Sequence, residues 1–239
     1  MRPTLLIIEA GDLPHPLQTT VLKTFPDLFM QAAGFGACTV KTLHAQRDRL
    51  PGNLYGYDGI LVTGSSSMVS DREPWSEKLA AWLRNAIQGE VKILGVCYGH
   101  QLIAHALGGL VGYHPNGMEL GTHEISLTYS GSKDDVFALL GGLPTKFEAN
   151  LSHCQTVLSP PREATLLGYS IHDPHQILGY SKNVLTLQFH PEFNQKIMRA
   201  YVNYILEQSK FENPDINLGA PIEETPVPQK ILQRFIDSL

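Results

Sequence analysis

The stretch that decides the fold is Ile93-Leu94-Gly95-Val96-Cys97-Tyr98-Gly99-His100-Gln101-Leu102-Ile103: an apolar run, a Gly-x-Cys-x-Gly turn and the start of a helix. A residue in a sharp turn between a buried strand and a helix is pushed out at the carboxyl edge of a sheet. Gly95 and Gly99 lack the Cβ atoms that would crowd such a turn. Unpaired N–H groups at the start of the helix favour a thiolate. Because buried structural cysteines are common, the stretch alone leaves two roles open for Cys97, reactive or structural.

Strand-like and helix-like segments alternate through the first half of the chain. Strands are predicted at 4–10, 38–43, 57–63 and 91–96, with a mostly helical stretch at 16–33, broken near Pro26, and a helix starting at Pro74. Near-continuous Val/Ile/Leu strands separated by helices are typical of a parallel sheet covered on both faces. The predicted fold class is therefore α/β, with a doubly wound, mostly parallel central sheet and flanking helices. Its chemistry is expected in the loops at the carboxyl ends of the strands.

The second half of the chain changes character. Alternating apolar and polar residues at 123–128, 146–151 and 165–171 predict half-exposed antiparallel strands, and hence a small antiparallel sheet. Segments 177–180 and 184–189 are expected to form a hairpin-like pair. We expect residues 1–211 to form one domain, followed at 212–239 by an extended Pro-rich segment and a short helix at 229–239. The apolar face of that helix is expected to pack on its own domain or to serve an oligomer or partner surface.

Composition excludes several classes of function. The 239 residues carry a net charge of −5, which gives no electrostatic reason for a nucleic-acid or anionic-membrane partner. No apolar run approaches the roughly 20 residues that cross a bilayer. Three cysteines are an odd number without metal-ligand spacing, which favours a reducing cytoplasm. His172, Asp173 and His175 are the best metal ligands by spacing, but no further ligands converge on them, so neither a metal nor a cofactor is expected.

A reactive cysteine needs a base within hydrogen-bonding reach. His190 follows the apolar strand at 184–189, and in a parallel sheet that is the edge at which Cys97 emerges. Glu192, two residues on, is placed to orient the imidazole and to stabilise its charged form. Intracellular peptidases and chaperones of similar fold usually take their histidine from the residue after the nucleophile, which here is Tyr98. The sequence therefore predicts a triad of Cys97, His190 and Glu192.

Two motifs carry a family resemblance. Gly-Val-Cys-Tyr-Gly-His-Gln at 95–101 and Gln-Phe-His-Pro-Glu at 188–192 resemble the signatures of class I glutamine amidotransferases, whose fold is flavodoxin-like. The resemblance covers about 5–208 and is strongest to the glutaminase domain of guanosine monophosphate synthetase and its free-standing relatives, which include γ-glutamyl hydrolases of peptides. The segments 117–121 and 151–153 also resemble that subgroup.

The resemblance implies roles for the triad. Cys97 would attack the γ-amide carbonyl of glutamine and form a glutamyl thioester. His190 would accept the thiol proton and pass it to the leaving ammonia, while Glu192 orients the imidazole. Backbone N–H groups of Tyr98 and of the Gly64-Ser65 loop would hold the oxyanion.

The resemblance also implies a substrate site, with two departures. Gln101 would help to seat the substrate, and backbone near Ser66, Cys154 and Gln155 would hold its α-amino and α-carboxylate groups. The loop after the third strand is Thr-Gly-Ser-Ser-Ser-Met here, where relatives are Gly- and Pro-rich. Gln155 stands where synthetase-type relatives often have an acidic residue that could pair with the substrate ammonium, which favours a γ-glutamyl compound other than free glutamine.

Three functions remain as hypotheses. The first is a cysteine-dependent hydrolase of glutamine or another small γ-glutamyl compound, acting alone or as a homo-oligomer. The second is the glutaminase subunit of a two-protein amidotransferase, with the C-terminal segment as its docking element toward a synthetase partner. The third is a non-catalytic binding module on the same fold.

Overall fold

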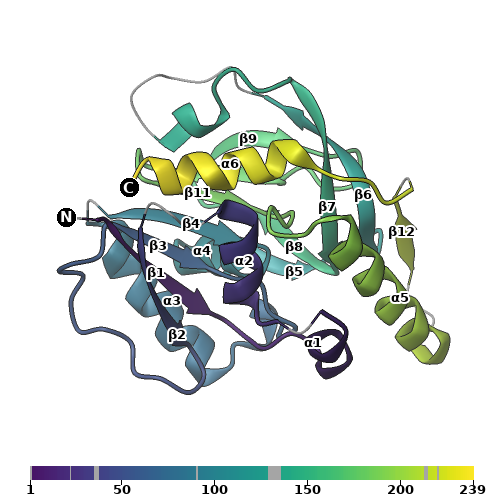
Figure 1. The fold of residues 1–239 in the computed structure, drawn as a ribbon, viewed down its shortest axis with the longest axis horizontal. Coiled ribbons are helices and arrows are strands. Elements are labelled where there is room, and N and C mark those ends of the chain that lie inside the picture. Colours follow the sequence, from purple (N-terminus) through teal and green to yellow (C-terminus); the bar gives the residue numbers. More distant parts are fainter. Residues whose placement is uncertain are drawn as a thin grey trace.

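The computed structural model describes residues 2–21, 23–34, 38–89, 91–128, 136–212, 215–219 and 221–239. A ten-stranded sheet crosses the molecule, with helices packed on both of its faces (Figure 1). Within the described ranges, none of the helices combines the length and the hydrophobicity needed to cross a bilayer.

Five neighbouring strands are parallel and run in the order β2-β1-β3-β4-β11. They are β1 (Thr4–Glu9), β2 (Thr39–His44), β3 (Gly59–Val62), β4 (Lys92–Val96) and β11 (Val184–Leu187). Successive side chains of a strand point to opposite faces. In β1, Leu5 and Ile7 accordingly join one buried cluster, and Leu6 and Ile8 join the other. A strand that is buried on both faces needs an uninterrupted apolar sequence, which is the pattern that predicted these strands.

Helices cover the two faces of this parallel region in different sets (Figure 1). One face carries α2 and α6, and the other carries α3 and α4. The helices are α1 (His15–Val21), α2 (Phe25–Ala33), α3 (Pro74–Ile87), α4 (Tyr98–Ala106), α5 (Gln195–Glu212) and α6 (Pro226–Asp237), with 3₁₀ turns η1 (Val69–Asp71) and η2 (Val136–Leu140).

The break expected near Pro26 is the start of α2. The hydroxyl of Thr24 accepts the N–H of Asp27 at 3.3 Å, and the Asp27 carboxylate accepts the N–H of Thr24 at 2.9 Å. This reciprocal cap favours a helix start, and proline is tolerated in the first turn because its missing N–H needs no partner there. The helix then ends at Gly34, whose φ of 64° suits glycine.

Further strands extend the sheet beyond β11 in the order β12-β6-β9-β10-β11, with β7 also paired to β6. These pairings are antiparallel, except that β12 pairs in parallel with β6. These strands are β6 (Met118–Leu127), β7 (Lys146–His153), β9 (Thr165–Tyr169), β10 (Ile177–Tyr180) and β12 (Ile216–Leu218). The predicted hairpin of β10 and β11 is confirmed. A small separate sheet pairs β5 (Leu110–Tyr113) with β8 (Gln155–Ser159) in antiparallel fashion.

The predicted architecture is confirmed, with one difference in its parts. The alternating segments around 123–128, 146–151 and 165–171 lie in β6, β7 and β9, which continue the main sheet. The small antiparallel sheet is made instead by β5 and β8, which carried too little alternation to be recognised. Their pairing is decided by contacts across the fold, because their partners are more than forty residues apart in the chain.

The C-terminal segment is more structured than expected. The extended stretch at 212–228 contains β12, which pairs in parallel with β6, and α6 begins at Pro226 rather than at residue 229. The apolar face of α6, including Ile231 and Phe235, is fully buried in the cluster that also holds Phe29 of α2. This helix therefore completes the core of its own chain.

Candidate active site

Cys97 occupies a strained turn directly after β4. Its φ of 51° lies in the left-handed region, which a non-glycine residue adopts only when its surroundings enforce it. The N–H of Cys97 donates to the carbonyl of Leu187 in β11 at 2.8 Å. A Cβ added to Gly99 would lie 2.4 Å from the Val62 carbonyl oxygen, and one added to Gly95 would lie 2.8 Å from the Gly99 carbonyl oxygen. The two glycines therefore permit the close approach that the sequence predicted.

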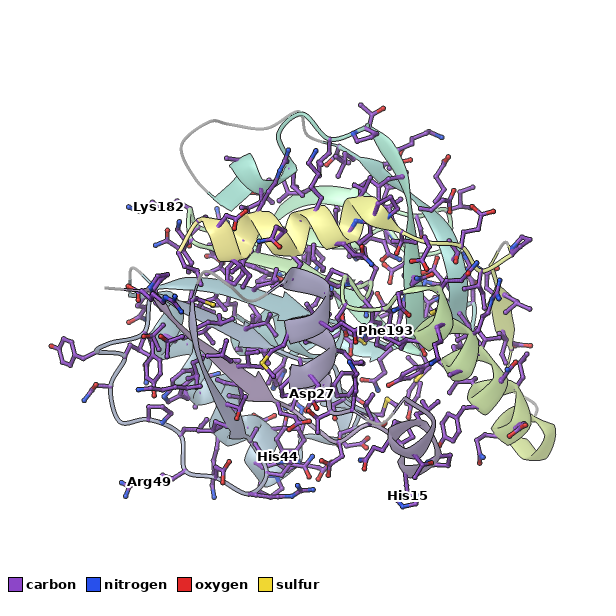
Figure 2. The ribbon with its side chains drawn as sticks, viewed as in Figure 1. His15, Asp27, His44, Arg49, Lys182 and Phe193 are labelled. Atoms are coloured by element: carbon purple, nitrogen blue, oxygen red, sulfur yellow. The ribbon has the colours of Figure 1, made fainter. Side chains whose placement is uncertain are left out.

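His190 and Glu192 form a buried pair beyond the end of β11. Nδ1–H of His190 donates to Oε1 of Glu192 at 2.7 Å, and both side chains are at most 3% exposed. The imidazole stacks on Phe193, just before α5 (Figure 2), with ring centroids 4.1 Å apart. Burial alone would lower the pKa of His190, but the charges of Glu192 and Cys97, and hydrogen bonds to both, raise it to about 10. The geometry therefore brings the three predicted residues together around a charged imidazole.

The Gly64-Ser65 loop follows β3 and lies against the imidazole. A Cβ on Gly64 would be 3.1 Å from Cε1 of His190, so the loop can approach this closely because residue 64 is glycine. The carbonyl of Thr63 accepts the N–H of Gly99 at 3.2 Å, which joins this loop to the cysteine turn. Tyr98 is the first residue of α4, so its own N–H has no partner within the helix. These positions suit the predicted oxyanion role.

A cavity of about 700 Å³ opens over these residues. Ser65, Ser66, Cys97, Tyr98 and His190 all line it, whereas Glu192 lies behind His190 and faces away. The cavity is also lined by the predicted substrate residues Gln101, Cys154 and Gln155.

The side chains of two predicted substrate residues, Gln101 and Gln155, are bonded to other groups of the protein. The side-chain Nε2 of Gln101 donates to the Gln155 backbone carbonyl at 2.6 Å and to Gln188 Oε1 at 2.9 Å. The Gln155 side chain is held by Ser70, because Nε2 donates to the Ser70 hydroxyl at 2.5 Å and Oε1 accepts the Ser70 N–H at 3.3 Å. Gln155 therefore does not place a free amide where relatives place a carboxylate.

Part of the cavity wall was not predicted as a site. Phe25, Met118, Tyr201, Tyr204 and Ile205 also line the cavity. Tyr201, Tyr204 and Ile205 belong to α5, and helical spacing cannot distinguish an apolar stripe that packs in a core from one that also borders a cavity.

The histidines considered as metal ligands have other partners. Nε2 of His172 bonds to the Gly117 carbonyl at 3.1 Å, and Nδ1 of His175 bonds to the Val157 carbonyl at 2.6 Å. Asp173 accepts the N–H of His175 at 2.8 Å. These contacts hold the turn together, and the three side chains do not converge as one ligand set.

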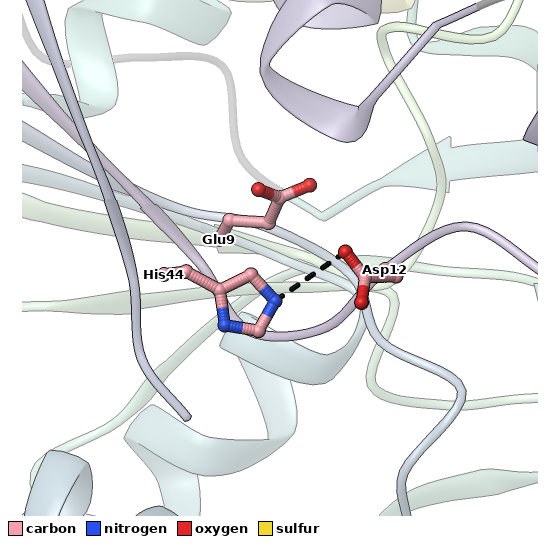
Figure 3. A group of neighbouring side chains, drawn as sticks. All are labelled: Glu9, Asp12 and His44. Carbon is pink, nitrogen blue, oxygen red and sulfur yellow. Dashed lines mark ion pairs between the residues drawn. The ribbon is translucent and has the colours of Figure 1, made fainter. Parts of the chain in front are cut away.

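A different group of possible ligands ends β1 and β2 (Figure 3). Glu9, Asp12 and His44 place their polar atoms within 4.8 Å of one another, with His44 Nε2 3.5 Å from Asp12. Burial, together with the charge of Asp12, raises the pKa of Glu9 to about 7. Nδ1 of His44 accepts the N–H of Gln46 at 3.3 Å, which places the ring proton on Nε2 facing Asp12. A metal would need the Nε2 lone pair, so this arrangement does not fit a metal site.

Comparison with known proteins identifies the family. The model of the family described as "Glutamine amidotransferase class-I" matches residues 30–205. The chain belongs to the class I glutamine amidotransferase family. It is 28% identical over 156 residues to "Gamma-glutamyl peptidase 5" of Arabidopsis thaliana, a match covering 65% of this chain but only 62% of that relative.

Two further relatives show how widely this glutamine amidotransferase domain is used. The chain is 34% identical over 134 residues to the GMP synthase of Aeropyrum pernix, covering 56% of this chain and 24% of that protein. The crystal structure of a glutamine amidotransferase from Methylobacillus flagellatus superposes with a TM-score of 0.73 at 20% identity, covering 100% of this chain and 96% of that one. At that identity the likeness shows the fold.

Proposed function

We propose that this chain hydrolyses a γ-glutamyl amide through a glutamyl thioester on Cys97. The observation that carries the proposal is the meeting of the strained cysteine turn and the buried His190–Glu192 pair at one end of the parallel strands, beside a cavity. Family membership and the γ-glutamyl peptidase relatives support the same class of reaction.

The reaction would proceed in two displacements. The Cys97 thiolate adds to the γ-carbonyl carbon, and the N–H groups of Tyr98 and of the Gly64-Ser65 loop hold the oxyanion. The C–N bond then breaks as the His190 imidazolium gives its proton to the departing amine. Neutral His190 next takes a proton from water, which attacks the thioester carbon and releases a γ-carboxylate and the thiolate. Glu192 keeps Nδ1 protonated, so Nε2 carries the proton in and out.

The cavity favours a substrate larger than glutamine. Its volume of about 700 Å³ lies within the range of sites that hold drug-sized ligands. Phe25, Tyr201, Tyr204 and Ile205 give the cavity an apolar wall in addition to its polar residues. We therefore propose a γ-glutamyl conjugate, with its leaving group seated on this wall, as the preferred substrate.

The subunit hypothesis keeps its support from the synthetase relative, but a C-terminal docking element would have to use surface other than the apolar face of α6. The face of α6 that would have met a partner is buried in its own chain. A glutaminase that depends on a partner would release little product when assayed alone.

The test is an assay of the purified chain against glutamine, a γ-glutamyl dipeptide and a γ-glutamyl amine, with glutamate and the leaving amine both measured. Turnover is expected without a partner and is expected to vanish in Cys97→Ala. Cys38→Ala is the matched control, because Cys38 is a core thiol outside the cavity, and it should retain the rate. Unchanged turnover in Cys97→Ala would refute the mechanism. Failure of a glutamine-analogue electrophile to label Cys97 would favour a binding module.

A further inference from the structure

Each of the two segments at 117–121 and 151–153 contributes one residue to a buried ion pair. Glu119 of β6 and His153 of β7 are register partners on neighbouring antiparallel strands. Nε2 of His153 lies 3.0 Å from Oε2 of Glu119, and the two side chains are at most 1% exposed. The two segments that resemble the family in this region thus supply the two halves of a single contact.

The hydrogen bonds around this pair define its charge. Nδ1 of His153 faces the Gln155 carbonyl at 3.0 Å, and a carbonyl only accepts, so this nitrogen carries a proton. Glu119 accepts bonds from Ser170 Oγ at 2.8 Å and from Gln176 Nε2 at 2.7 Å, which favours its ionised form. Nε2 of His153 therefore donates to a carboxylate. With both ring nitrogens donating, His153 is an imidazolium.

The pKa shifts agree with this arrangement. Burial opposes both charges, yet hydrogen bonding and the charge of the partner raise the pKa of His153 and lower that of Glu119. The charge of Cys97 also raises the pKa of His153. His153 and Cys97 line the same cavity, and a positive charge near a cysteine sulfur favours its thiolate form.

The pair lies at the candidate active site. His153 and Ser152 line the cavity with Cys97, and Sγ of Cys97 is 3.9 Å from the Ser152 carbonyl oxygen. The Gln155 backbone carbonyl, which bonds to Nδ1 of His153, also accepts a hydrogen bond from the side-chain Nε2 of Gln101. His153 is thus tied to backbone on which the substrate is proposed to bind, while neither ring nitrogen is left to contact a ligand.

We propose that His153, kept as an imidazolium by Glu119, is a positioning residue that stabilises the Cys97 thiolate and holds the Gln155 carbonyl in place. The proposal rests on the proposed function in assigning Cys97 as the nucleophile. It assigns to His153 a fixed charge, distinct from the proton transfer assigned to His190.

Other ionisable groups also face this region. They are His190, Glu192, Asp173, His123, His100, His114, His175, Cys154 and Tyr201. Burial lowers the pKa of His100 to about 3 and also lowers that of His114, so both rings are neutral at pH 7. His123 has its Nε2 on the Leu120 carbonyl and lies 3.6 Å from Glu119, on the side of the carboxylate away from His153 Nε2.

The test measures the rate of Cys97 alkylation by iodoacetamide from about pH 5 to about pH 10, followed by mass spectrometry so that Cys38 and Cys154 are counted separately. Glu119→Gln should raise the pH midpoint of Cys97 alkylation by about one unit, which slows alkylation about tenfold at pH values below the wild-type midpoint. Ser170→Ala is the matched control, because it removes one hydrogen bond to Glu119 and keeps the charge. It should leave the midpoint unchanged.

A wild-type midpoint in a folded Glu119→Gln variant would overturn the proposal, and so would an equal shift in Ser170→Ala. Should Glu119→Gln fail to fold, the imidazole nitrogen shifts of histidine-labelled wild-type protein decide, since a neutral His153 ring near pH 7 would refute the assignment. Alkylation needs no γ-glutamyl substrate. Failure of this proposal is therefore distinguishable from failure of the proposed function, which the Cys97→Ala assay tests.

Discussion

Replacement of Glu192 by Gln is expected to weaken the charged form of His190 with little change in shape. The Glu192 carboxylate accepts Nδ1–H of His190 at 2.7 Å in a site that is almost fully buried. A glutamine can still accept that hydrogen bond through its Oε1 atom, but it carries no charge. The variant therefore separates the electrostatic contribution of Glu192 from its orienting contribution.

The size of the effect follows from the pKa of His190. A rise from 6.5 to about 10 corresponds to roughly 5 kcal/mol in favour of the imidazolium. Glu192 and the Cys97 thiolate share this stabilisation, so loss of Glu192 should cost about 2–3 kcal/mol, or about 100-fold in kcat/KM. The imidazolium is the form present below its pKa. The alkaline limb of kcat/KM should therefore lie near pH 10 in the wild type and move toward neutral pH in the variant.

The assay is the pH profile of kcat/KM on the best γ-glutamyl compound of the panel. Glu77→Gln is the matched control, because Glu77 also accepts from a histidine, His105, at 2.8 Å but lies outside the cavity. It should match the wild type. An alkaline limb unchanged in Glu192→Gln, with kcat/KM within about threefold of wild type, would show that Glu192 does not hold the charge of His190.

Two further predictions concern the scaffold. Gly99→Ala places a Cβ 2.4 Å from the Val62 carbonyl oxygen, so it should destabilise the fold by about 1–3 kcal/mol, measured by thermal unfolding. It should also reduce the labelling of Cys97, measured by mass spectrometry. An unchanged melting temperature would contradict the close approach. Phe235→Ala empties a fully buried site under α6 and should cost about 3–5 kcal/mol in denaturant unfolding. A loss below about 1 kcal/mol would mean that this helix contributes little to the core. Lys230→Ala, at an exposed position of the same helix, should be neutral.

The inner strands of the parallel half, β1, β3, β4 and β11, were predictable because their sequences are almost continuously apolar. A strand that is buried on both faces needs apolar residues at successive positions, and this pattern is visible in the sequence, as in Leu5 to Ile8. Strands β5 and β8 show no comparable apolar pattern in the sequence, because each is short and partly exposed and each is paired with a distant segment. The β12 strand escaped prediction for the same reason, being three residues long within a Pro-rich stretch.

The candidate triad was predictable because each of its residues sits at a strand end whose edge the parallel topology dictates. Gly95 and Gly99 were interpretable for a similar reason, because a tight turn excludes side chains in any fold. Gln155 was predictable as a position but not in its contacts, because its bond to Ser70 joins residues 85 positions apart.

The sequence by itself determined the alternation of strands and helices in the first half, the cysteine turn and the His-Pro-Glu strand end, because periodicity and local turn chemistry are properties of neighbouring residues. Only the tertiary structure decided that α5 borders a cavity, that α6 belongs to the core, and that Glu119 meets His153. Those facts depend on which distant segments the sheet brings side by side. A charge such as that of His153 is stable only where folding places a carboxylate and a carbonyl on its two nitrogens.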